Sequence, residues 1–257
     1  MCLILVAWRA HPDYPLVVAA NRDEFFARPT APASFWPDRP ILAGRDRKEG
    51  GTWMGITRSG RFAALTNYRD PRRERAGAVS RGGLVVDYLG TNEAPVTWLG
   101  ANAASAVNYN GFNLIAASGD QLAWASNVTG ACQTLGPGVY GLSNHLLDSP
   151  WPKVQAARSA LAGALTALPD YRPLFDLLRD DTVHPDEQLP RTGVSIEWER
   201  LLSSAFVKAP GYGTRSSTVL LASRDGTLTV DEQTWLEGGK AGGRVCFRFR
   251  LEAGASS

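Results

Sequence analysis

The chain opens with Met1-Cys2-Leu3-Ile4-Leu5-Val6-Ala7-Trp8, and a second apolar run, Leu16-Val17-Val18-Ala19-Ala20, follows after a short polar segment. Short continuous apolar runs of this kind, bounded by turn residues, are typical of buried strands. The intervening His11-Pro12-Asp13-Tyr14-Pro15 contains residues that favour turns. The sequence therefore predicts a buried antiparallel hairpin at its start.

Further hairpins are expected along the chain, each flanking a turn that contains glycine. They pair residues 52–57 with 61–66, 112–117 with 121–125, and 218–223 with 228–231. Helical patterns are fewer and cover residues 80–89, with Ser80 as a candidate cap, and residues 98–107, 151–168 and 171–179. Residues 180–195, rich in proline and charge, are expected to form a surface loop. Hairpins combined with a few longer helices favour an α+β fold.

Length, composition and charge limit the classes of function that the chain can have. The 257 residues are 44% hydrophobic and show no linker, so we expect one domain over residues 1–257. The net charge of +2 does not favour a nucleic-acid partner, and a small molecule is expected instead. No apolar run approaches the roughly 20 residues of a membrane span. Three scattered cysteines indicate a reducing compartment, and hence a cytoplasmic protein.

Several familiar motifs are incomplete. The glycines at 136, 138 and 141 fit a dinucleotide-binding spacing, but Pro137 interrupts it and no helix follows. The three histidines are widely separated, so no zinc site is expected. The arginines at 69, 72, 73 and 75 alternate with acidic residues, which indicates a solvated loop rather than a nucleic-acid surface.

Cys2 stands directly after the initiator methionine, and a small residue there permits removal of Met1. The freed α-amino group, with a pKa near 8, could then act as the base for the thiol of the same residue. The alternative is that Cys2 is a small apolar residue that starts a buried strand. Cys132 and Cys246 are expected to be buried in strands and therefore to react more slowly than Cys2.

Asn21-Arg22-Asp23-Glu24 resembles the signature of the NRDE family, whose eukaryotic members are called transport and Golgi organization protein 2 homologues. The match includes further blocks in the family's order, up to about residue 220. They are Met1-Cys2-Leu3-Ile4, Gly50-Gly51-Thr52-Trp53-Met54-Gly55, Thr66-Asn67-Tyr68-Arg69, Gly141-Leu142-Ser143-Asn144 and Gly213-Thr214-Arg215-Ser216-Ser217-Thr218. The chain is identified as a member of that family.

The chain is more distantly similar to N-terminal-nucleophile hydrolases of the choloylglycine hydrolase and penicillin V acylase type. Those enzymes carry an initial Cys, an early Arg and Asp, two later Asn and a late Arg. This resemblance implies an αββα sandwich, two antiparallel sheets between helices. The matching residues here, in the same order, are Cys2, Arg22, Asp23, Asn67, Asn144 and Arg215.

The resemblance also implies roles. Cys2 would attack a linear amide or thioester without a cofactor, and Asp23 would hold its amine. Asn67 and Asn144 would form the oxyanion hole, while Arg22 and Arg215 would favour the thiolate. One departure concerns the early pair, because Arg22 and Asp23 are adjacent here and would point to opposite faces of a strand.

Two functions follow as hypotheses. The first is an N-terminal cysteine hydrolase or acyl transferase, and the second is a non-catalytic carrier of haem or an acyl-coenzyme A or other lipid on the same fold. Haem would need an axial ligand such as His145, Cys132 or Cys2. The first hypothesis predicts that Cys2, Arg22, Asn144 and Arg215 converge at one pocket, although the sequence leaves the substrate and the oligomeric state open.

Overall fold

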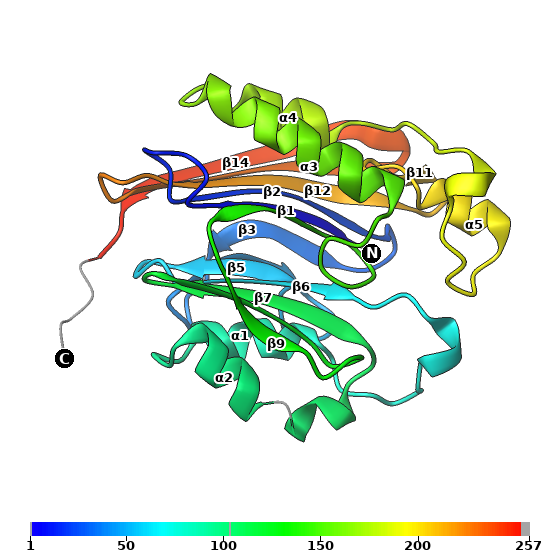
Figure 1. The fold of residues 1–257 in the computed structure, drawn as a ribbon, viewed down its shortest axis with the longest axis horizontal. Helices are drawn as coiled ribbons and strands as arrows, with labels where there is room; N and C mark the ends of the chain where they lie inside the picture. The colour runs from blue at the N-terminus through cyan, green and yellow to red at the C-terminus, as the bar shows by residue number, and fades with distance from the viewer. Residues whose placement is uncertain (1, 103, 253–257) are drawn as a thin grey trace.

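Helices enclose two stacked sheets in four layers, as Figure 1 shows for a computed structural model of the chain that describes residues 2–102 and 104–252. Both sheets are seven-stranded within that part of the chain, and their ladders are antiparallel. The predicted αββα sandwich is confirmed. No helix among the described residues is long and apolar enough to cross a membrane.

The first sheet, here called sheet A, carries the N-terminal hairpin at its centre. Its strands, in spatial order, are β10 (Gly138–Leu142), β1 (Cys2–Trp8), β2 (Leu16–Phe25), β12 (Tyr212–Ala222), β13 (Thr227–Leu236) and β14 (Lys240–Arg250), and β11 (Lys208–Ala209) pairs with β12. Strands from the two ends of the chain therefore lie side by side.

The second sheet, sheet B, follows the chain from one strand to the next. Its strands are β3 (Thr30–Phe35), β4 (Ile41–Asp46), β5 (Met54–Thr57), β6 (Phe62–Asn67), β7 (Phe112–Ser118), β8 (Gln121–Ser126) and β9 (Cys132–Leu135). Gly60, at φ +83°, supplies the left-handed turn residue between β5 and β6.

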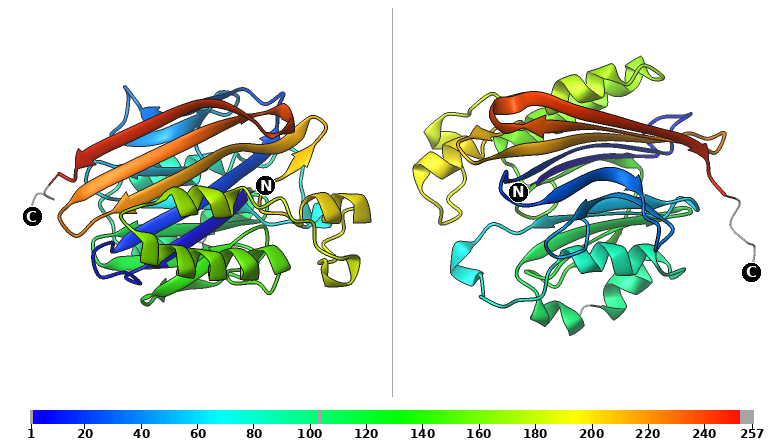
Figure 2. Two further views of the ribbon diagram at one scale, coloured as in Figure 1. Left: turned by 90° about the horizontal axis from the view of Figure 1, so that it is seen from above. Right: turned by 180° about the vertical axis from the view of Figure 1, so that it is seen from behind.

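Helices cover the outer face of each sheet (Figure 2). Sheet A is covered by α3 (Pro152–Ala164) and α4 (Arg172–Leu178), and sheet B by α1 (Gly82–Leu89) and α2 (Pro95–Ala101). The short α5 (Ile196–Leu201) lies at the end of the sandwich where β1 begins. Short 3-10 turns occur at Pro71–Arg73, Ala104–Asn108, Leu165–Ala167, Asp186–Gln188 and Glu237–Gly239.

Alternation along β1 explains the layering. Ile4 and Val6 point into the apolar core between the sheets, whereas Leu3 and Leu5 pack against α3 and α4. All four side chains are fully buried. Both faces of this hairpin thus bury apolar area, which is why its sequence is continuously apolar rather than alternating.

The structure corrects several predicted elements. The second strand continues from Leu16 to Phe25, through the NRDE signature, instead of ending at Ala20. The helix expected at residues 98–107 is α2, which starts earlier at Pro95 and ends at Ala101. Ser80 does not cap α1, whose N-cap residue is Arg81 without a side-chain bond. Strands β3, β4, β10 and β11 and helix α5 were not expected from the sequence, whereas β9 and β14 are the strands expected around Cys132 and Cys246.

Candidate active site

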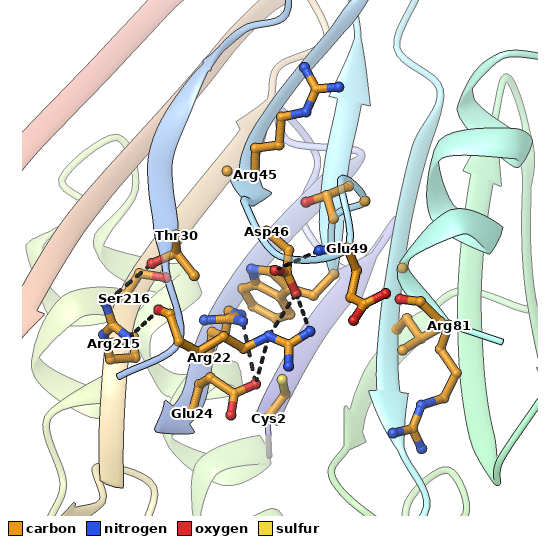
Figure 3. Close-up of a pocket in the computed structure, with 18 of the residues that line it drawn as sticks. Cys2, Arg22, Glu24, Thr30, Arg45, Asp46, Glu49, Arg81, Arg215 and Ser216 are labelled. Carbon is orange, nitrogen blue, oxygen red and sulfur yellow. Dashed lines mark hydrogen bonds and ion pairs between the residues drawn. The ribbon is translucent and has the colours of Figure 1, made fainter. Parts of the chain in front are cut away.

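Cys2 and Arg22 are neighbours on the inner face of sheet A. They stand directly opposite each other in the β1–β2 ladder, one register step beyond the fully buried pair of Leu3 and Asn21. Cys2 shares the side of β1 that Ile4 and Val6 present to the other sheet. At the start of β1, the inner face therefore changes from apolar side chains to a thiol next to a guanidinium (Figure 3).

Arg215 reaches the same place because β12 contains a bulge. Thr214 pairs with Asp23 and Ser216 with Arg22, so Arg215 is an extra residue between two ladder positions. Its guanidinium donates hydrogen bonds to the carbonyl oxygens of residues 25, 26 and 28 at 2.9–3.3 Å and to Thr30 Oγ1. Arg215 thus fastens the turn from β2 to β3 at the edge of the site.

A cavity of about 340 Å³ lies in front of these residues, between the two sheets. Five of the predicted site residues line it, namely Cys2, Arg22, Asp23, Asn67 and Arg215. Further lining residues are the charged Glu24, Arg28, Arg45, Asp46, Glu49, Arg81 and Glu232. Some of these charged side chains are paired with each other, and Arg28 bonds Asp46 at 2.6 Å. The cavity is therefore polar, unlike the rest of the space between the sheets.

Asn144 does not line the cavity but is hydrogen-bonded to Asn67, which does. It is fully buried, and its Nδ2 donates to the backbone carbonyl of Asn67 at 2.9 Å. The preceding Ser143 donates from Oγ to the carbonyl of Cys2 at 3.1 Å. The two predicted oxyanion asparagines are thus joined to each other and to the strand of the nucleophile, although only Asn67 lines the cavity.

Asp23 occupies the opposite face of β2 from Arg22, as adjacent strand residues must. Its carboxylate is buried and accepts a hydrogen bond from Thr214 Oγ1 at 2.8 Å. Burial raises the pKa of Asp23, while the positive charges of Lys153 and Arg69 lower it. The expected Arg and Asp therefore act from two sides of the strand that faces Cys2.

Asp23 belongs to a buried charged cluster beneath the site, defined by Asp23, Arg69, Lys153 and Glu199. Arg69 pairs with Glu199 at 2.7 Å, with both side chains under 5% exposed. Lys153, 4% exposed, donates to the carbonyl of Leu202 at 2.8 Å, and desolvation lowers its pKa to about 8. Burying four charges is costly unless they are well paired, so apolar packing alone would not select them.

This buried charged cluster was not predicted from the sequence. Arg69 was assigned to a solvated loop with Arg72, but it is buried and paired because Glu199 of α5 packs onto it. Lys153 did carry a signal. It stands four and eight residues before the buried Ala157 and Leu161, and so lies on the apolar face of α3.

The cysteines correct a second expectation. Cys132 and Cys246 do lie in strands, β9 and β14, but both are exposed, whereas Cys2 is buried. Burial and the negative charge of Asp23 raise the pKa of the Cys2 thiol, and Arg22 and the backbone N–H of Asp23 lower it. Removal of Met1 concerns a residue outside the described part of the chain. Among the candidate haem ligands Cys2, Cys132 and His145, Cys2 is the one that lines the cavity.

The fold has a counterpart among solved structures. The C2A mutant of the conjugated bile acid hydrolase from Clostridium perfringens superposes with a TM-score of 0.50 at 7% identity, covering 98% of this chain and 92% of that chain. At such low identity the likeness concerns the fold alone.

Sequence comparison gives the family. The family model "Transport and Golgi organisation 2" matches residues 1–237. The transport and Golgi organization protein 2 homologues of Bos taurus and Homo sapiens are 37% and 36% identical to this chain, over 92% of it and 94% of each relative. The chain therefore belongs to the Transport and Golgi organisation 2 family.

Proposed function

We propose that this protein is an N-terminal cysteine hydrolase or acyl transferase that acts on a linear amide or thioester. The observation that carries the proposal is the placement of Cys2. It begins a buried strand, its side chain lines a polar cavity, and Arg22 stands beside it. An apolar residue starting a strand would need none of these surroundings.

In this proposal Cys2 Sγ attacks the acyl carbon, and the α-amine freed by loss of Met1 takes the thiol proton. That proton then passes to the leaving amine or thiol as the carbonyl re-forms, which yields a thioester on Cys2. Water, or an acceptor in acyl transfer, resolves the thioester. Asp23, on the far side of β2, would hold the amine and stabilise the ammonium group that forms when the amine takes the thiol proton.

Asn67 and Asn144 would stabilise the oxyanion. Asn67 lines the cavity, and Asn144 has a second amide N–H beyond the one it gives to the Asn67 carbonyl. The buried cluster supports this arrangement, because the positive charges of Lys153 and Arg69 favour the ionised form of Asp23. Arg22 has the same effect on the thiolate of Cys2.

The test compares wild type with Cys2→Ser on a panel of hexanoyl amides, a hexanoyl thioester and p-nitrophenyl hexanoate. We expect the wild type to turn over at least one of them, and Cys2→Ser to lose most of that turnover while keeping its melting temperature. A serine hydroxyl is much harder to deprotonate with an amine base of pKa near 8. Unchanged turnover in Cys2→Ser would rule out Cys2 as the nucleophile.

Carriage of haem or an acyl-coenzyme A is the alternative proposal, and the same pair of proteins separates it. A carrier would bind and release hexanoyl-coenzyme A without consuming it, and Cys2→Ser would leave that affinity unchanged. Haem binding through Cys2 would instead be visible as a thiolate absorption spectrum that disappears in Cys2→Ser.

A further inference from the structure

Arg81 faces Cys2 across the cavity, and the sequence analysis did not single it out. Cys2 comes from sheet A, whereas Arg81 directly precedes α1 on the sheet B side (Figure 3). Its Nη1 donates to the carbonyl oxygen of Gly111 at 3.0 Å. Among the described residues, no carboxylate lies within ion-pair distance of this guanidinium.

The other arginines that line the cavity are already engaged. Arg215 donates from Nη1 and Nη2 to three carbonyl oxygens and a hydroxyl, which fixes its guanidinium against the β2–β3 turn. The remaining arginines have carboxylate partners, with Arg22 on Glu24 at 3.5 Å, Arg28 on Asp46 at 2.6 Å and Arg45 on Asp38 at 3.2 Å. Among the lining arginines of the described chain, Arg81 and Arg215 have no carboxylate within ion-pair distance, and Arg81 differs from Arg215 in making a single hydrogen bond, to one carbonyl oxygen.

The other acidic side chains that line the cavity do not pair with Arg81. Glu232 is buried and accepts hydrogen bonds from the Ala33 backbone N–H at 2.7 Å and from Thr218 at 3.2 Å. Glu49 belongs to an exposed turn. A guanidinium that is partly desolvated and keeps several N–H donors free favours a planar anion that can bind two of them at once.

A carboxylate suits the site better than a phosphate. Glu24, Asp46 and Glu49 line the same cavity, so a second negative charge on the ligand would be repelled by these carboxylates. We propose that Arg81 binds a carboxylate of the substrate, which narrows the substrate class to linear amides or thioesters that carry a carboxylate in the part held in the cavity. The substrate class rests on the proposed function, whereas the anion site does not require turnover.

The experiment measures binding without turnover. In Cys2→Ala protein, the dissociation constants of N-hexanoylglycine and its neutral isostere N-hexanoylglycinamide are compared by titration calorimetry at pH 7. We expect the carboxylate to bind roughly 10-fold to 100-fold more tightly, as for a charge-assisted bidentate contact. Adding Arg81→Gln should reduce the ratio to about one, and Arg81→Lys should leave part of it.

Arg45→Gln is the matched control, because it removes the same charge from the same cavity. Its guanidinium extends away from Cys2 and is paired with Asp38, so the preference should survive. Equal affinities for the two ligands in Cys2→Ala, or no binding of N-hexanoylglycine, would overturn the proposal whether or not Arg81→Gln folds. So would a preference that persists in folded Arg81→Gln.

A third ligand, N-hexanoyl-aminomethylphosphonate, tests the choice of anion. We expect it to bind more weakly than the carboxylate, and tighter binding would overturn the assignment to carboxylates. These outcomes are separate from the proposed function. If wild-type protein cleaves neither acyl ligand nor any of the activated substrates, the hydrolase proposal fails, while the affinity ratio still decides whether Arg81 is an anion site.

Discussion

The two ends of the β1–β2 hairpin share one ladder but differ in what fills the space in front of them. At the end where Trp8 pairs with Leu16, the inner face is apolar and almost fully buried. At the end where Cys2 pairs with Arg22, the inner face opens into a charged cavity. The first end stabilises the fold, whereas the second places polar groups where apolar ones would be more stable, which indicates function.

We call the Trp8–Leu16 end of the hairpin the closed end and the Cys2–Arg22 end the open end. The largest expected effect on stability is at the closed end. Ile4→Ala removes a fully buried side chain from the core between the sheets and should lower the free energy of unfolding by about 2–5 kcal/mol. Urea denaturation measures it, with Cys2→Ala as the matched truncation at the open end. If Cys2→Ala costs as much as Ile4→Ala, the two ends do not differ in the way described.

Asn67→Ala tests the open end through catalysis. Loss of one oxyanion donor reduces the rate by roughly 10²-fold to 10³-fold. Stability should change little, because Asn144 bonds the backbone carbonyl of Asn67 and not its side chain. Turnover of p-nitrophenyl hexanoate per folded molecule is the readout. A normal rate in Asn67→Ala would exclude its side chain from the oxyanion hole.

Lys153→Met tests the cluster beneath the open end through pH. Burial lowers the pKa of Lys153 in the folded chain to about 8, from the ordinary lysine value of 10.5. Between these two values the unfolded chain binds more protons, so the wild type should gain stability relative to Lys153→Met as pH rises through this window. The gain should be at most about 3 kcal/mol. Unfolding free energies at pH 7 and pH 10.5 measure it, and a constant difference would mean that Lys153 is not desolvated.

The smallest effect is expected at the exposed thiols. The double variant Cys132→Ser and Cys246→Ser changes two side chains on the surface of edge strands β9 and β14. Each change should alter the free energy of unfolding by less than about 0.5 kcal/mol. Thermal melting checks this. A large loss of stability would show that these strands contribute more to the fold than their exposure indicates.

The closed end could be predicted from sequence because its signal is local. Continuous apolar runs and glycine turns specify the hairpins, and residues such as Ile4 and Val6 report burial by themselves. The elements that were missed are short or exposed. Strand β3 buries one of its six residues, and α5 is a six-residue helix.

The residues of the open end could be predicted only from the family resemblance, because their arrangement depends on contacts between segments far apart in the sequence. The bulge at Arg215 and its bonds to the β2–β3 turn join segments about 190 positions apart, which no local pattern specifies. Arg69 looked solvated because its neighbours in sequence are charged, and only Glu199, 130 positions away, explains its burial. Arg81 carried no signal at all, since a single arginine before a helix is typical of a surface position.

The central claim is that Cys2, once Met1 is removed, is the nucleophile at the open end. General alkylation would not single it out, because Cys132 and Cys246 are exposed. The direct measurement is intact and peptide mass spectrometry of the wild type, and of the double variant lacking those two thiols, after brief treatment with p-nitrophenyl hexanoate. The account predicts a chain that starts at Cys2 and carries one hexanoyl group on that residue in both proteins. Retained Met1, or hexanoyl groups confined to Cys132 and Cys246, would contradict it.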